Sequence, residues 1–423
     1  MGDVLFTNVR LVDPASGLDQ PGQLLVQAGR IADFGPALGR PDVPTIDGDD
    51  AILCPGLVDM RAALGEPGYE YRETIASAAA AAASSGITTL AALPDSLPAI
   101  DDPALVRLLR ARGEETRSLA ILPYAAVTRG CQGKEMAEIG LLREAGAVAF
   151  TDGRRAIGDA RMMRLALSYA RGFGARIVQH PEDPALADGG AATEGELATR
   201  LGLPGIPAAA EAILVARDIR LAQLTSGALH FAHVSTAEAL MLIRRAKRDG
   251  IDVTCDTAPP YFDLNETAIG DFRTYAKLSP PLRPEVDRVA VCEGLADGTV
   301  DAIASDHQPR DADDKRLPFA LASPGGAGLA TLLGVTLAQV HGNGLPLLRA
   351  LDLLTAQPAR VLGIDAGRLV KGAVADLCLF DLERIWKVEA GSLPGKAPNT
   401  PFDGRALEGR VVGTWKAGRR VFG

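Results

Sequence analysis

The sequence is poor in the features of disulfide-rich, membrane-spanning and nucleic-acid-binding proteins. Its five cysteines are scattered along 423 residues without a CxxC pair, which argues against a disulfide framework and suits a reducing cytoplasm. No apolar run reaches the roughly 18 residues of a membrane span, and no signal peptide is visible. The net charge of −9 is not offset by any basic cluster. We therefore expect a cytoplasmic protein with neither a nucleic-acid nor a membrane partner.

The two ends of the chain share a β-rich texture that the middle lacks. Short apolar segments at 4–7, 24–28 and 31–34 are separated by glycines, and similar segments return at 375–380 and 410–421. Apolar residues make up 47% of the chain, enough for a large core. We expect residues 1–52 and 366–423 to form one small β-sandwich domain.

Residues 53–365 alternate between strand-like and helix-like patterns. Helical patterns at 75–85, 105–115, 160–170, 208–222 and 236–247 separate the apolar strand runs, which lie near 56–60, 87–92, 119–127, 146–151, 175–179, 227–232, 251–257 and 299–305. Eight such units predict an α/β protein with a (β/α)₈ TIM-type barrel. In that fold the chemistry lies at the carboxyl ends of the strands.

Histidine and aspartate recur at these predicted strand ends. Strand one runs into Asp59, and Asp152, His180, His233 and Asp306 lie at the ends of strands four, five, six and eight. Neutral imidazole and carboxylate are ligands for Zn²⁺ or Mn²⁺, and a carboxylate can also accept a proton from metal-bound water. These residues therefore indicate a metal-dependent hydrolytic site.

Each of these residues also has a purely structural interpretation. A lone strand-end histidine is more often a hydrogen-bonded structural residue, and a strand-end aspartate often caps the next helix. The chain has only five histidines, so two at strand ends favour a functional cluster. We interpret His230 and His307 as supporting or structural residues, and we expect His341 in a loop.

Six segments carry a resemblance to a known family. PGLVDM, GAVAFTDG, QHPEDPAL, HFAHVSTAEAL, KLSPPLR and DAIASDH resemble dihydroorotases of the amidohydrolase superfamily, most closely the type that occurs with aspartate transcarbamoylase in bacterial pyrimidine synthesis. The resemblance extends from LVDPASG near the start to ADLCLFD near the end. It implies a binuclear zinc hydrolase that opens or closes the dihydroorotate ring.

The resemblance also assigns ligands. Asp152, His180 and His233 match the ligands of one metal, so that site is nominally complete with three protein ligands. Asp306 matches a ligand of the other metal and the catalytic base. The family's His-x-His, followed by a substrate-binding Arg, is replaced by Arg61-Ala62-Ala63-Leu64-Gly65. Arg61 and Ala63 are thus degenerate ligand positions. We hypothesise that the Arg61 guanidinium replaces the lost metal charge by pairing with Asp152 and Asp306.

Positions that contact substrate in the family have changed as well. Met-Pro-Asn-Thr has become a segment with Asp95, Asn-Pro-Pro-Leu-Arg has become Ser279 through Arg283, and Asp-His-Ala-Pro-His now ends in Arg310. We predict Asp95, Ser279, Arg283 and Arg310 as the substrate-binding set. The Pro-His-His of the strand-seven loop is here Pro-Pro-Tyr, ending at Tyr261.

Two functions remain open. In the first, the protein is catalytically inactive, holds no metal, and supports the assembly of aspartate transcarbamoylase. In the second, it is a one-zinc hydrolase of dihydroorotate or another cyclic amide, with Asp306 as base and with Arg283 and Arg310 holding a different anionic group. In both cases we expect a homo-oligomer.

Overall fold

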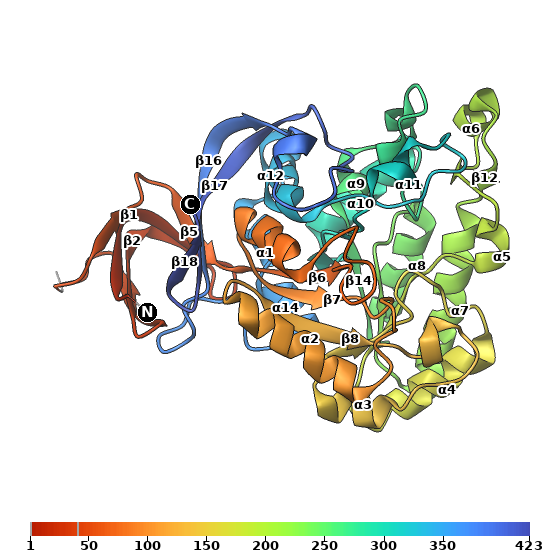
Figure 1. The fold of residues 1–423 in the computed structure, drawn as a ribbon, viewed down its shortest axis with the longest axis horizontal. Helices are drawn as coiled ribbons and strands as arrows, with labels where there is room; N and C mark the ends of the chain where they lie inside the picture. The colour runs from red at the N-terminus through yellow and green to blue at the C-terminus, as the bar shows by residue number, and fades with distance from the viewer. Residues whose placement is uncertain (1, 40–41) are drawn as a thin grey trace.

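Eight parallel strands form the barrel in the computed structural model, which describes residues 2–39 and 42–423 (Figure 1). In order around the sheet they are β6 (Leu57–Ala62), β7 (Ile87–Ala92), β8 (Ala120–Ala125), β9 (Ala149–Phe150), β10 (Ile177–Gln179), β13 (Leu229–Phe231), β14 (Val253–Thr257) and β15 (Ala302–Ile303). A parallel bridge between Ala62 and His307 joins the two ends of the sheet. The expected (β/α)₈ barrel is confirmed.

Helices lie outside the strands (Figure 1). They include α1 (Ile75–Ser84), α2 (Pro103–Thr116), α3 (Ile139–Ala145), α4 (Ala160–Arg171), α7 (Ala209–Thr225), α8 (Ala237–Arg248), α10 (Glu285–Asp297), α12 (Leu332–Asn343), α13 (Leu347–Asp352) and α14 (Ala356–Leu362). Side chains cap several of them; Thr74, for example, accepts a hydrogen bond from the Ser77 amide at the start of α1. His341 lies within α12, so its expected loop position is wrong. No helix of the described ranges is long and apolar enough to cross a membrane.

Strands from both termini form a second sheet beside the barrel (Figure 1). It contains β1 (Val4–Asp13), β2 (Leu18–Gln27), β3 (Arg30–Gly35), β4 (Thr45–Asp47), β5 (Ile52–Pro55), β16 (Leu377–Lys387), β17 (Ala406–Lys416) and β18 (Arg419–Phe422). Strand β1 pairs with β2 on one edge and with β4 and β5 on the other. The sheet has its own core, in which the rings of Phe6 and Trp415 meet edge to face with centroids 4.8 Å apart. The small β domain built from both termini is thus confirmed.

The chain between β16 and β17 returns from this sheet to the open end of the barrel. The Lys396 amide donates to the Glu73 carboxylate, and Asn399 hydrogen-bonds to the backbone of Gln308 and Gly325. The C-terminal domain therefore fixes loops that border the strand ends.

We predict that Phe6→Ala destabilises the terminal domain by about 3–5 kcal/mol, because it removes a fully buried ring and leaves a cavity against Trp415. Urea unfolding followed by tryptophan fluorescence measures this loss. Ile385→Ala in the same domain is the matched control, since that side chain is 72% exposed. Equal unfolding midpoints for the two variants would contradict the assigned core.

Candidate active site at the carboxyl ends of the strands

The predicted site residues lie just beyond the strand ends. Asp152 follows β9, His180 follows β10, His233 follows β13 and Asp306 follows β15. The rings of His180 and His233 stack with centroids 4.8 Å apart. His233 and Asp306 have left-handed backbones, with φ of 40° and 44°. Such φ values are strained for residues with side chains and are concentrated at functional sites.

Arg61, from β6, is the largest fully buried side chain of the described residues and is 1% exposed. Its Nε donates to Asp306 Oδ1 at 2.9 Å, and its Nη2 donates to the Gly153 carbonyl at 3.1 Å. Its Nη1 is buried without a partner among the described residues. The guanidinium therefore lies at the strand ends and pairs with Asp306. This part of the hypothesis, the pairing of Arg61 with Asp306, is confirmed.

The other half of the hypothesis is wrong, because Arg61 does not pair with Asp152. One carboxylate oxygen of Asp152 accepts the Val127 and Thr128 amides at 3.0 and 2.9 Å, and the other accepts the Thr128 hydroxyl at 2.5 Å. Burial raises the pKa of Asp152, while these hydrogen bonds act in the opposite direction. The loop after β8 thus satisfies the carboxylate that would otherwise attract a cation.

The His233 ring lacks hydrogen-bond partners for its nitrogens. Both ring nitrogens are buried without a partner among the described residues, as is His180 Nδ1. Burial, followed by the charges of Arg61 and His180, holds the pKa of His233 well below its usual value. The ring is therefore neutral, which is the form that binds a metal.

These nitrogens do not complete a zinc site. Zinc in catalytic sites takes three protein ligands, and here the Asp152 oxygens point to the Val127 and Thr128 donors. Within residues 2–39 and 42–423, no three His, Cys, Asp or Glu side chains are grouped so that they could hold a metal ion. The side chains as arranged fit two imidazole ligands, not the three-ligand set that the sequence predicts.

The predicted substrate-binding residues separate into two groups. Asp95 and Arg310 line one pocket, together with Ala63, and Ser279 Oγ lies 3.3 Å from His180 Nε2. Arg283 is instead buried among other residues. Its Nε donates to the Ser235 hydroxyl at 3.0 Å, and its Nη2 lies 3.6 Å from Glu211. The structure gives Arg283 a role in holding the loops together.

Sequence reasoning missed four residues near the site. Glu182 accepts a hydrogen bond from Ser279; burial raises the pKa of its carboxyl, but His180 and Ser279 outweigh this and lower it. Arg72 and Arg154 line the pocket with Asp95, and Thr128 binds Asp152. Glu182 and Arg154 each lie two residues beyond a predicted strand-end residue, a spacing that could have indicated them.

His230 and His307 make the structural contacts that were expected. His230 lies between Thr254 at 2.8 Å and Asp256 at 2.9 Å, and Asp256 also accepts the His233 amide. His307 Nδ1 accepts the Gly328 amide at 3.2 Å, and its Nε2 lies 3.4 Å from Glu73. Both rings fix the loops that carry the site residues.

The barrel, the terminal sheet and the strand-end residues define the amidohydrolase class. A family profile described as "Dihydro-orotase-like" matches residues 50–239, and one described as "Amidohydrolase family" matches residues 335–422. The chain is 43% identical to a dihydroorotase of Pelobacter propionicus and 42% identical to one of Syntrophus aciditrophicus, each over 99% of both chains. The chain belongs to the dihydroorotase family.

A solved structure supports the same assignment of fold. The L-hydantoinase (dihydropyrimidinase) of Arthrobacter aurescens superimposes with a TM-score of 0.88 at 25% identity, covering 100% of this chain and 96% of that one. The barrel with its terminal β domain is therefore an architecture that the chain shares with amidohydrolases.

We predict that Arg61→Met and Asp306→Asn each destabilise the protein by about 3–5 kcal/mol, because each leaves one buried partner of the ion pair uncompensated. The double variant should regain much of this loss. Chemical unfolding of all four proteins forms a double-mutant cycle. Arg244→Met is the control, since its pair with Asp297 is exposed and should contribute less than about 1 kcal/mol. Additive losses for Arg61 and Asp306 would contradict the coupling.

Proposed function

We propose that this dihydroorotase-family protein does not hydrolyse cyclic amides and instead serves pyrimidine biosynthesis as a structural partner of aspartate transcarbamoylase. The contact between Arg61 and Asp306 carries the proposal. In the family resemblance, position 61 is a metal-ligating histidine and Asp306 is both ligand and base. Here a protein cation lies 2.9 Å from that carboxylate.

Arg61 and Gln308 both donate hydrogen bonds to Asp306, the residue that matches the family's base. Gln308 Nε2 contacts both carboxylate oxygens, at 2.9 and 3.1 Å, in addition to the bond from Arg61. The pKa of Asp306 is raised overall by burial, although Arg61 and Gln308 act to lower it. Protonation of this carboxylate would weaken the contacts from Arg61 and Gln308, because donors stabilise the ionised form.

The position of the family's substrate-binding arginine is closed by the backbone. Gly65 has φ of 70°, and a Cβ there would lie 2.4 Å from the Glu73 carbonyl oxygen. A side chain at this position therefore requires the loop to move. Loss of the arginine and the lack of room for a side chain at Gly65 together support a barrel that no longer orients dihydroorotate.

A second candidate is a one-zinc cyclic amidohydrolase. The comparisons favour it over the first, because relatives at 42–43% identity across the whole chain are named dihydroorotase. The unpartnered nitrogens of His180 and His233 also favour it. In this candidate Asp152, His180 and His233 hold the zinc ion, with the Thr128 hydroxyl supporting the Asp152 carboxylate, and Asp306 is the base.

Zinc content and dihydroorotate hydrolysis, measured on one preparation purified without chelator, separate the candidates. We expect no bound zinc and no turnover above buffer background, whereas a relative with both histidines is active in parallel. About one zinc ion per chain with turnover, both lost in His233→Ala, would establish the second candidate and refute the first.

The partner is tested separately. Size-exclusion chromatography of the chain with aspartate transcarbamoylase from the same organism should give a joint peak, and transcarbamoylase activity should rise when the chain is added. Separate peaks and unchanged activity would refute the proposed partner. A joint peak in a preparation that also hydrolyses dihydroorotate would refute only the inactivity.

A further inference from the structure

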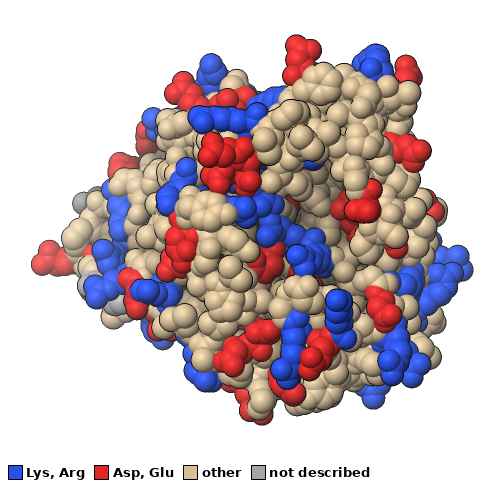
Figure 2. All heavy atoms as spheres, turned by 45° about the vertical axis from the view of Figure 1, so that its right-hand side comes forward, with Lys and Arg blue, Asp and Glu red and all other residues tan. Residues whose placement is uncertain are grey.

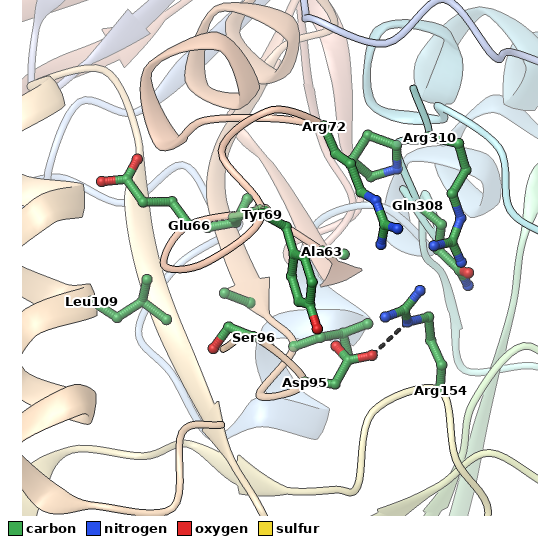
Figure 3. Close-up of a pocket in the computed structure, with 15 residues that line it drawn as sticks. Ala63, Glu66, Tyr69, Arg72, Asp95, Ser96, Leu109, Arg154, Gln308 and Arg310 are labelled. Atoms are coloured by element: carbon green, nitrogen blue, oxygen red, sulfur yellow. Dashed lines mark hydrogen bonds and ion pairs between the residues drawn. The ribbon is translucent and has the colours of Figure 1, made fainter. Parts of the chain in front are cut away.

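Three arginines from separate loops converge on one pocket at the open end of the barrel. Arg72 follows β6, Arg154 follows β9 and Arg310 follows β15, and all three line the pocket. Figure 3 shows their guanidinium groups directed toward a common space, with the Gln308 amide and the Tyr69 ring at its edge. On the face in Figure 2, Lys and Arg atoms border a central hollow within a surface of mixed charge.

The positive charge of this pocket is only partly balanced. Arg72 lies 3.2 Å from Asp314, and Arg154 lies 2.5 Å from Asp95. Glu66 also lines the pocket, but its carboxylate lies 3.8 Å from a further cation, Arg112. Within the part of the chain that the structure describes, Arg310 has no carboxylate within the 4.0 Å of an ion pair. One cation in excess therefore remains.

Arg310 also keeps donors free for a ligand. Its Nε donates to the Pro324 carbonyl at 2.8 Å, and its two terminal nitrogens make no hydrogen bond to the described residues although the residue is only 7% exposed. Burial, followed by the neighbouring charges of Arg154 and Arg72, lowers the pKa of Arg310 to about 10. Such crowding of like charges is relieved when an anion binds between them.

The backbone holds Arg310 in place. Asn399, fully buried, accepts the Arg310 amide at 3.1 Å and donates to the carbonyls of Gln308 and Gly325 at 3.2 and 2.9 Å. Gly325 is required there, because it has φ of 127° and a Cβ would lie 2.8 Å from Gln308 Cβ and 3.2 Å from Arg310 Nε. The guanidinium is thus positioned without any ligand, which lowers the entropic cost of binding.

We propose that Arg72, Arg154 and Arg310 form a binding site for a phosphoryl group, either inorganic phosphate or a phosphate monoester. Each guanidinium presents paired N–H donors, and three guanidiniums from three loops can each meet a different oxygen of a tetrahedral anion. A carboxylate offers only two oxygens in one plane. The site goes beyond the proposed function, because it requires neither hydrolysis nor the transcarbamoylase partner.

Isothermal titration calorimetry with inorganic phosphate at fixed ionic strength tests the site. We expect saturable binding to the wild type and a loss of about tenfold or more in affinity for Arg310→Met. Asp95→Asn should tighten binding, because it frees the Arg154 guanidinium from its carboxylate. Arg316→Met is the matched control, since its side chain is 78% exposed and should leave the affinity unchanged.

Three other results of the titration would contradict the proposed phosphate site or decide it by other variants. Absence of saturable binding to the wild type, or equal losses in Arg310→Met and Arg316→Met, would overturn it. Tighter binding of malonate than of phosphate would replace the phosphoryl group with a dicarboxylate and overturn the ligand class. If Arg310→Met does not fold, the opposite effects expected of Asp95→Asn and of Arg72→Met on phosphate affinity decide the matter.

Discussion

A buried positive charge at the carboxyl ends of the barrel strands constrains everything around it. A guanidinium that is 1% exposed loses its hydration, and the cost is offset only if an anion and well-placed acceptors surround it. Asp306 supplies the anion and the Gly153 carbonyl a further acceptor. The same charge helps to hold the neighbouring His233 in its neutral form. One side chain on β6 thus acts, after burial, on the pKa values of both His233 and Asp306.

The backbone around this charge is tied down from several sides. Asp59 accepts the amides of Arg61 and Ser305 and the Ser305 hydroxyl, so it joins β6 to the chain beyond β15 where the barrel closes. Burial raises the pKa of Asp59 to about 6, and the hydrogen bonds from Ser305 oppose that rise. The rigidity of this junction explains how Arg61 and Asp306, far apart in sequence, are held in one fixed arrangement.

The barrel, the terminal domain and the contact between Arg61 and Asp306 could be predicted from the sequence, whereas the predicted contact between Arg61 and Asp152 is absent. The family resemblance placed Arg61 at a lost metal-ligand position and Asp306 at a ligand of the same metal, so their pairing could be predicted from the replaced residue. The state of Asp152 did not follow, because its partners are backbone amides and a hydroxyl in a loop that carries no sequence pattern. The contact of Arg283 with Glu211 did not follow from the sequence for the same reason, since it depends on tertiary packing.

The terminal sheet makes completion of the fold depend on the last part of the chain to be synthesised. Strand β5 pairs with β16, joining Ile52 to Phe380, so its edge stays open until almost the whole chain has left the ribosome. The barrel strands between them can associate earlier, because their neighbours follow closely in sequence. During that interval β5 is an unpaired apolar edge, open to incorrect strand pairing. A ribosome that stalls before β16 would therefore release a chain with a nearly formed barrel and an aggregation-prone N-terminal sheet.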